Sequence, residues 1–533
     1  SGDENAGHYR MLAERTAQFA MGPQEQSPWS RNLRMVAGLQ FLGGSMATAA
    51  VQLSSLPMNV VPNLYQHTSY GSAWTKTLSA AKLTFANFKT LRDLVKLKDS
   101  NVTIPGVDAE LKAALARAGE DGTRLDTELY QLMGLTRGGV FAKSRGVQQA
   151  IATWMAPFRW SEQANRIATF IAAYRTGQEN GLAGDKLYEF AQKLVYDTQF
   201  RYDEANRPAI TRSPTWAVLF TFKSYPIFMA EMIYMLFKEK PQAGVAMLAG
   251  LTLAAGTNGI PFAEDLMDLI DTISQRVFGR PFNSKRALHN MLKSASEAAV
   301  GADWSNVIMN GAANELLGLS IASRVGLGNL LPGTRTFAVD ADTESQLKEI
   351  FGPVGSMVHN WSRGIGAGLQ GDIVELARTG APSAIQNIIK GVEQGIAGYA
   401  QDVKGRKIVD VNGWQAFWQA LGFSSSTLSQ AYELDRMDKQ STAFYNHMRQ
   451  EFMQQIVGAI RDGDREKIQE TVDAINSWNE ANPDMLIRLN PASVRRNLVQ
   501  AQLPINQRTL QMLPKPLRAS SIARETAMEA EAE

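Results

Sequence analysis

Apolar residues recur at three- and four-residue spacing along most of the chain, which is the period of an α-helix with one buried face. The pattern predicts helices over residues 161–174, 186–196 and 439–461. Convincing strand alternation is absent, and at most short pieces such as residues 407–411 read as extended. We therefore expect an all-α, elongated multi-helix protein.

Capping residues mark several helix ends. Asp108 is a plausible N-cap of a helix over residues 107–117, and Gly119 lies near its expected end. Asp464 opens another helix that runs to about Trp478. Asn490 precedes a proline, which fits the first position of a helix.

Proline- and glycine-rich breaks suggest the domain organisation. No repeat of fixed period is visible. We expect five parts: an N-terminal helical segment over 1–100, a central helical domain over 101–335, a helical connector over 336–410, a C-terminal helical domain with a basic end over 411–518, and an acidic disordered tail over 519–533.

Two stretches carry no Asp, Glu, Lys or Arg, namely residues 35–75 and 241–263. Within them, residues 35–56 and 244–260 approach the roughly 20 apolar residues that span a bilayer, and both are rich in the small residues that let helices approach closely. Polar side chains and a mean hydropathy of −0.20 equally fit buried helices of a large α-helical assembly. Buried helices, conditional membrane insertion and permanent insertion all stay open.

The residues in these stretches that we expect to contact a membrane or another subunit share small or apolar side chains. They are Met35, Phe41, Gly43, Gly44, Gly244, Leu248, Gly250, Leu253 and Gly256.

The amino-acid composition excludes several kinds of functional site. The chain has no cysteine, which excludes disulfides, zinc fingers, Fe–S clusters and cysteine nucleophiles within it. A net charge of +2 excludes a basic coat over the whole surface, so any DNA contact must be a local patch. The chain begins with Ser1 and lacks an apolar run over residues 1–23, so we read it as lacking a signal peptide and as a piece of a longer or processed polypeptide.

The sequence contains no strong catalytic motif. The histidines show no metal-ligand spacing, and no phosphate loop, GxSxG or lytic transglycosylase signature occurs. Glu264, Asp265, Asp268 and Asp271 follow Pro261, and the favoured interpretation is a solvated amphipathic helix, with a metal or carboxylate site as the alternative. No metal and no cofactor is expected.

The C-terminal region carries a local excess of positive charge without acids between Asp484 and Glu525. Such a patch could hold DNA phosphates or neutralise a partner or neighbouring subunit. The residues expected to make these contacts are Arg488, Arg495, Arg496, Arg508, Lys515 and Arg518.

Aromatic clusters at residues 216–222, 225–237 and 414–418 are more typical of a core or an interface than of a cofactor site.

Ordered sequence blocks over about residues 140–518 resemble the C-terminal region of phage large polyvalent proteins, which include the internal virion (ejection) proteins of short-tailed phages. The blocks are WSEQANRIATFIAAY from Trp160, NRP from Asn206, FKSY from Phe222, GIPFAEDL from Gly259, SRVGLGNLLPG from Ser323, RDGD from Arg461, WN at Trp478, NP at Asn482, Ser493 with RR at Arg495, and LPKP from Leu513.

The resemblance implies a structural role, in which the chain forms part of a ring or tubular assembly. Such a protein is stored in the virion interior, in the capsid core, and released to help form a channel for genome delivery across the host cell envelope. The expected partners are other internal virion proteins and further copies of the chain, with the portal, double-stranded DNA and the host inner membrane as additional contacts. After ejection the expected location is the host periplasm or inner membrane.

The alternative is a module of a virion-associated enzyme, a peptidoglycan hydrolase or virion RNA polymerase, whose catalytic domain lies outside this chain. In a variant of that alternative, Glu264, Asp265 and Asp268 would supply the acids. The chain itself is expected not to be an enzyme.

Overall fold

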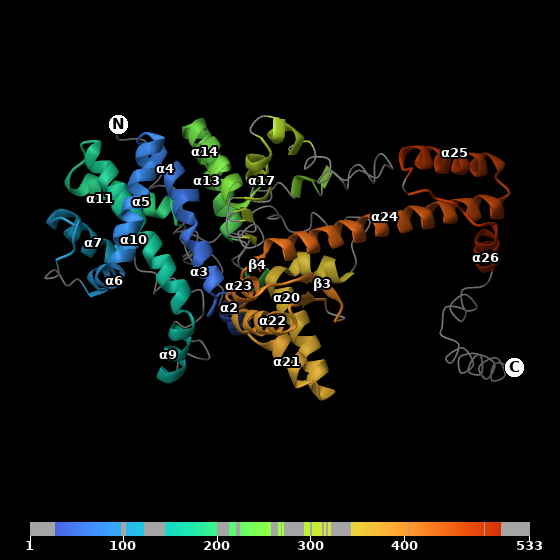
Figure 1. Ribbon diagram of the computed structural model, residues 1–533, viewed down its shortest axis with the longest axis horizontal. Helices are drawn as coiled ribbons and strands as arrows, with labels where there is room; N and C mark the ends of the chain where they lie inside the picture. Colours follow the sequence, from blue (N-terminus) through green and yellow to red (C-terminus); the bar gives the residue numbers. More distant parts are fainter. Residues whose placement is uncertain are drawn as a thin grey trace. The chain divides into compact units, whose positions relative to one another are not determined.

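The fold is all-α, as the periodicity predicts (Figure 1). In this computed structural model the described residues are 27–97, 103–121, 144–199, 213–219, 224–256, 265–267, 269–270, 291, 293–298, 301–311, 314–315, 318–320, 343–402, 405–483 and 485–502. Contacts divide the chain into two units. Unit 1 comprises Ser1–Thr272 and Asn283–Glu433, and unit 2 comprises Ile273–Phe282 and Leu434–Glu533.

The first half of unit 1 is a succession of mostly short helices. They are α2 (Pro28–Phe41), α3 (Met46–Leu53), the π-helix η1 (Leu56–Val60), α4 (Val61–Tyr65), α5 (Tyr70–Ala86), α6 (Phe88–Leu97), α7 (Ala109–Asp121), α9 (Arg145–Trp154), α10 (Ala156–Glu179), α11 (Gly184–Thr198), α12 (Pro214–Leu219), α13 (Ser224–Glu239) and α14 (Pro241–Ala255).

The second half of unit 1 adds further helices and two pairs of short strands. The elements are α17 (Ala302–Asn310), β1 (Leu319–Ser320), α20 (Thr343–Leu369), α21 (Ile373–Gly380), α22 (Ser383–Ala397), β2 (Tyr399–Gln401), β3 (Lys407–Asp410), α23 (Gly413–Ala420) and β4 (Ser424–Ser425). Strand β2 pairs with β3, and β1 pairs with β4, both antiparallel. The extended piece predicted at residues 407–411 is therefore the second strand of a hairpin between α22 and α23.

Helix α10 lies at the centre of the main core of unit 1. It packs against α3, α5 and α11, and it buries residues on all of its sides, from Phe158 to Gly177. Ile167, Phe170 and Ile171 are almost fully buried there with leucines of α6 and α7. Helices on both sides of residue 100 therefore share one hydrophobic core.

Local capping explains several helix starts. Asp108 Oδ1 accepts a hydrogen bond from the amide of Leu111 at 2.7 Å, as the sequence predicts for α7. Helix α7 ends at Asp121, two residues after Gly119, so this glycine lies near the helix end as predicted. At Gly119 a Cβ would lie 1.9 Å from the carbonyl oxygen of Val95, so this glycine allows α7 to approach α6 closely.

Unit 2 contains most of α24 (Ser426–Asp462), which begins in unit 1, together with α25 (Arg465–Ala481) and α26 (Pro491–Gln502). Asp464 caps α25 by accepting from the amide of Lys467 at 3.1 Å, as predicted. Phe444, Phe452 and Trp478 form the core between α24 and α25.

The segment that follows α25 is held against this core. The side-chain amide of Asn479 donates to the carbonyl of Ile487 at 3.2 Å and accepts from its amide at 2.7 Å. Trp478 Nε1 also donates to the carbonyl of Met485 at 2.9 Å.

Candidate interaction surface

The expected contact residues of the first charge-free stretch lie against helices of the same chain. Met35 is buried, and it packs with Ile151, Met155 and Phe158. Phe41 is half-buried and packs against a second cluster, formed by α2, α12 and α20.

Gly43 and Gly44 form a tight corner between α2 and α3. A Cβ on Gly43 would lie 1.9 Å from Trp154 Nε1, and one on Gly44 would lie 2.6 Å from the same indole ring. Gly44, with φ of +65°, also donates its amide proton to the carbonyl of Trp154 at 2.8 Å. In this structure both glycines make room for Trp154.

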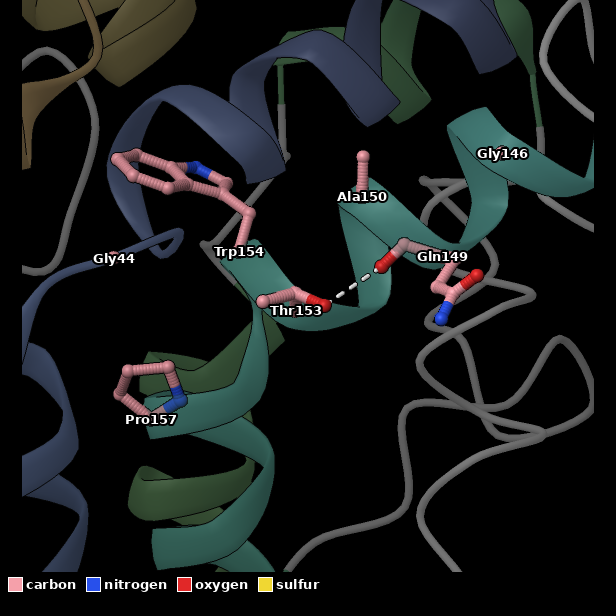
Figure 2. A pocket seen from close by; sticks show the side chains of 7 residues that line it. All are labelled: Gly44, Gly146, Gln149, Ala150, Thr153, Trp154 and Pro157. Carbon is pink, nitrogen blue, oxygen red and sulfur yellow. Dashed lines mark hydrogen bonds between the residues drawn. The ribbon is translucent and has the colours of Figure 1, made fainter.

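A hollow of about 510 Å³ opens beside this corner (Figure 2). Its lining residues are Gly44, Gly146, Gln149, Ala150, Thr153, Trp154 and Pro157. The hydroxyl of Thr153 donates to the carbonyl of Gln149 in its own helix at 2.9 Å. None of these described lining residues carries an acidic or basic side chain.

Within the second charge-free stretch, α14 covers Pro241–Ala255, and Gly256 is its C-cap. A Cβ on Gly244 would lie 2.7 Å from the ring of Phe237 in α13, and one on Gly256 would lie 2.3 Å from the carbonyl oxygen of Met309. Leu248 packs on a methionine-rich cluster shared with α13. Gly250 has open space around it, and Leu253 lies in α14, although its side chain is outside the described residues.

Among the described residues, no single helix is both long enough and apolar enough to cross a membrane. The segments Asn32–Phe41 and Met46–Tyr65 reach that length and composition only as a pair, and they are bent by 87° at their junction.

Only part of the acidic cluster that follows Pro261 lies within the described residues. Asp265 is 2% exposed, whereas Glu264, Asp268 and Asp271 lie outside the described residues. Within the described part of the chain, no group of three or more His, Asp or Glu side chains is placed to hold a metal ion.

The most polar part of the core is a cluster that we call the polar seam, where α10 meets α3, η1 and the end of α11. It comprises Gln52, Ser55, Asn59, Glu162, Asn165, Arg166, Thr169, Thr198 and Gln199.

The polar seam holds a buried ion pair. Arg166 Nε lies 3.3 Å from Glu162 Oε1, and Arg166 Nη2 donates to the carbonyl of Gln199 at 3.3 Å. Asn165 Nδ2 donates to Ser55 Oγ at 3.0 Å and also to the carbonyl of Gln52. Glu162 and Arg166 are 5% and 1% exposed, so substrate has no access to these charges, and we assign the polar seam a structural role.

The opposite situation occurs on α22 and α23, where large apolar side chains face solvent. On α22, Ile385, Ile388, Val392 and Ile396 are 38%, 51%, 53% and 83% exposed. Their spacing of three and four residues places them on one side of the helix. On α23, Trp414 and Phe417 are 58% and 51% exposed.

These six side chains lie on the same side of the helix pair. A Cβ on Gly391 would lie 2.5 Å from the amide nitrogen of Ala420, whereas Gly395, one turn later, faces the Ala416 methyl group at 3.5 Å. The two helices therefore run antiparallel. Along each helix, the exposed residues are rotated away from the contact line in the same sense. Because both helices are right-handed and they run antiparallel, the two sets of exposed residues lie on the same side of the pair. We call this surface, formed by the six side chains, the apolar face.

Stacking orders the aromatic part of the apolar face. The rings of Trp414 and Phe417 are stacked with centroids 5.9 Å apart, and Trp418 meets Trp414 edge-on at 5.3 Å. Trp418 also contacts Phe423, which is buried. The cluster predicted to be core or interface thus has one inward and one outward side.

Several charged side chains of α22, of the β2–β3 hairpin and of neighbouring helices form ion pairs within the described part of the chain. The hydrogen bond from Arg378 to Glu393, at 2.5 Å, raises the pKa of the arginine and keeps it ionised. Further ion pairs include Arg378–Glu375 at 3.5 Å, Arg363–Glu375 at 3.0 Å, Arg406–Asp402 at 2.6 Å and Lys407–Asp410 at 2.6 Å.

Part of the basic C-terminal region, which begins after Asp484, lies within the described residues of unit 2. Arg488, Arg495 and Arg496 are exposed, while Arg508, Lys515 and Arg518 lie outside the described residues. Ile487 is buried in the core of unit 2, and Leu489 packs against that core. Arg488 lies between these two residues and stays exposed, available to a partner.

The periodicity analysis singled out residues 414–418 but missed the branched stripe of α22. One available signal was a third charge-free stretch over residues 411–432, between Asp410 and Glu433. Another signal was the spacing of Ile385, Ile388, Val392 and Ile396. The same spacing is equally typical of a buried helix face, so it does not by itself indicate an exposed stripe.

Comparison with known proteins gives no match to a protein-family model, to a curated protein or to a solved structure.

Proposed function

We propose that this chain is a structural subunit of a multi-copy protein assembly. The observation that carries the proposal is the apolar face on α22 and α23, where four branched aliphatic and two aromatic side chains face solvent. Contiguous exposed apolar surface of this kind typically marks a protein–protein contact.

The assembly that we propose is the genome-ejection apparatus of a short-tailed phage. Support comes from the ordered sequence blocks that resemble internal virion proteins and from the all-α fold without cysteine. In this proposal the chain is stored in the capsid core with other internal virion proteins, leaves with the genome, and helps to form a channel across the host periplasm or inner membrane.

Two further features have a place in this proposal. Arg488, Arg495 and Arg496 would contact double-stranded DNA or an acidic partner such as the portal, because all three are exposed. Helices α2, α3 and α14, which contain residues of the two charge-free stretches, pack within unit 1, where they would hold the subunit together. The chain has no catalytic role of its own in this account, and any enzymatic domain would lie elsewhere.

The test is the protein content of virus particles before and after genome release. The proposal predicts that the chain is present in full particles and lost from emptied ones. It also predicts that Ile388→Asp, on the apolar face, reduces incorporation, whereas Leu78→Asp does not. Leu78 is a matched control because it is also exposed, on α5, outside the apolar face.

A chain absent from full particles would contradict the ejection role. A chain retained in emptied particles would point instead to a capsid scaffold. Loss of a virion-borne hydrolase or polymerase activity upon replacement of Glu264, Asp265 and Asp268 would favour the enzyme-module alternative.

A further inference from the structure

We propose that the apolar face joins two copies of this chain, with α22 of one copy packed against α22 and α23 of the other across a twofold axis. This inference rests on the proposed function, since it takes the apolar face to be an assembly surface, and it names the partner.

The size of the apolar face fits such a dimer. A large aromatic side chain has roughly 150–250 Å² of surface, so the six partly or largely exposed side chains present on the order of 600 Å². Two such faces would bury on the order of 1,200 Å², which is the lower end of the range for specific protein interfaces. One face alone is at the upper end of what single-chain proteins leave exposed, about 300–600 Å².

The charge distribution favours a second copy over a charged partner. None of the six side chains is charged, and Arg378 and Lys407, in the described part of the chain near α22, are engaged with Glu393 and Asp410. Nucleic acid or an anionic membrane would gain few new ion pairs here. A neutral apolar surface is the complementary partner, and a second copy supplies one of matching size.

The shape of the stripe also fits self-association. Ile385, Ile388, Val392 and Ile396 form a ridge at three- and four-residue spacing, which can interlock with the same ridge of another helix. Branched side chains have few rotamers, so ordering them at an interface loses little entropy. A twofold arrangement brings the same surface of both copies together and closes the assembly at two.

The absence of cysteine allows a direct test on the full chain. In Val392→Cys the single thiol lies on the stripe, near the expected twofold axis, where two copies can approach disulfide distance. In the control Lys390→Cys the thiol is exposed on the opposite side of α22. Under mild oxidation we expect Val392→Cys to form a reductant-sensitive species of twice the 58.5 kDa chain mass, and Lys390→Cys to remain at the chain mass. Ile396→Cys serves as a second stripe variant should Val392→Cys fold poorly.

Sedimentation of the unmodified chain provides the second arm. We expect the mass to double with increasing concentration and to stay at one chain in Ile388→Asp. Equal cross-linking of the stripe and control variants, or a dimer that persists in Ile388→Asp, would overturn the inference. Such a result leaves the particle-content test of the proposed function unaffected, so the two failures are distinguishable.

A lipid partner gives a different result. If the chain stays monomeric and floats with phosphatidylcholine vesicles, and Ile388→Asp abolishes flotation, the apolar face binds membrane and the dimer inference is wrong.

Discussion

Helices α10 and α22 distribute polarity in opposite ways. Helix α10 buries a charged pair, Glu162 and Arg166, in the middle of the main core, whereas α22 turns isoleucines and a valine toward solvent. Both helices are well formed, so helix formation alone does not decide which residues are covered. In α10 the polar seam supplies partners from α3, η1 and α11, which satisfy most of the buried polar groups.

The difference separates what stabilises the fold from what is available for assembly. A buried polar group costs free energy unless it is hydrogen-bonded, so the polar seam restricts how α3 and η1 can pack on α10. An exposed apolar group contributes little to the stability of one chain, but it contributes strongly once a partner covers it. Variants in the two helices should therefore affect different properties.

The largest effect is expected for Arg166→Met in the polar seam. Removing the cation breaks the buried ion pair between Arg166 and Glu162, and breaking such a pair typically costs about 3–5 kcal/mol. The measurement is the free energy of unfolding from denaturant titration of the full chain. The double variant Glu162→Gln/Arg166→Met should lose less, because no charge stays buried.

Lys193→Met is the exposed counterpart for this prediction. Lys193 and Asp197 form a surface pair at 3.9 Å with the same four-residue spacing, and surface pairs contribute about 0–1 kcal/mol. Equal losses for Arg166→Met and Lys193→Met would show that the polar seam does not stabilise unit 1.

The next comparison applies one substitution to both helices. Ile167 of α10 is fully buried, so Ile167→Ala should cost about 2–5 kcal/mol of unfolding free energy. Ile388 of α22 is exposed, so Ile388→Ala should stay within about 0.5 kcal/mol for the dissociated chain. Thermal unfolding at low protein concentration measures both. A large loss for Ile388→Ala under these conditions would mean that the apolar face is covered within one chain.

A smaller effect is expected at the contact between α22 and α23. Gly391→Ala would place a methyl group 2.5 Å from the backbone of Ala420, and such overpacking typically costs about 1–3 kcal/mol. Gly395→Ala meets only ordinary contact at 3.5 Å, and alanine favours a helix over glycine by up to about 1 kcal/mol. We expect the first to lower the unfolding temperature and the second to leave it unchanged or raise it. The reverse order would contradict the antiparallel register of the pair.

The smallest effect is expected at His67. Its side chain is partly buried, and it is therefore intermediate between the buried residues of α10 and the exposed residues of α22. Partial burial of its ring beside Phe190 lowers the pKa of His67, and the ammonium of Lys193 adds to this, whereas Glu239 acts in the opposite direction. Because the unfolded chain then binds the proton more readily, stability should fall as the pH drops through the usual histidine value near 6.5 and below.

The expected change is small because much of the side chain reaches solvent. His67→Gln should remove this part of the pH dependence of the unfolding temperature. An unchanged profile in the variant would assign the dependence to other groups.

The sequence predicted the features that depend on local chemistry. Periodicity located α10, α11, α24 and α25, and the caps Asp108 and Asp464 marked two helix starts. Gly119 lies near the end of α7 as predicted, but no local pattern reveals that it also admits the backbone of α6.

Placement in three dimensions could not be predicted in the same way. The Gly43-Gly44 pair marks a break in the charge-free stretch at residues 35–75, but the sequence does not reveal the 87° bend or the packing of this corner against Trp154, more than a hundred residues away. The stripe of α22 has the periodicity of a buried face, and only the fold shows that α23 leaves it open. The aromatic residues 414–418 were predicted as core or interface, and the structure shows both sides of that cluster.

The most direct test of the apolar face as an assembly surface is oxidative footprinting of the full chain at low and high concentration. We predict that Trp414 and Phe417 are readily oxidised at low concentration and become protected at high concentration. Trp160 of α10, which is 51% exposed outside the apolar face, should stay reactive at both. If Trp414 and Phe417 remain as reactive as Trp160 at every concentration, the apolar face does not join copies of this chain, and the central claim is wrong.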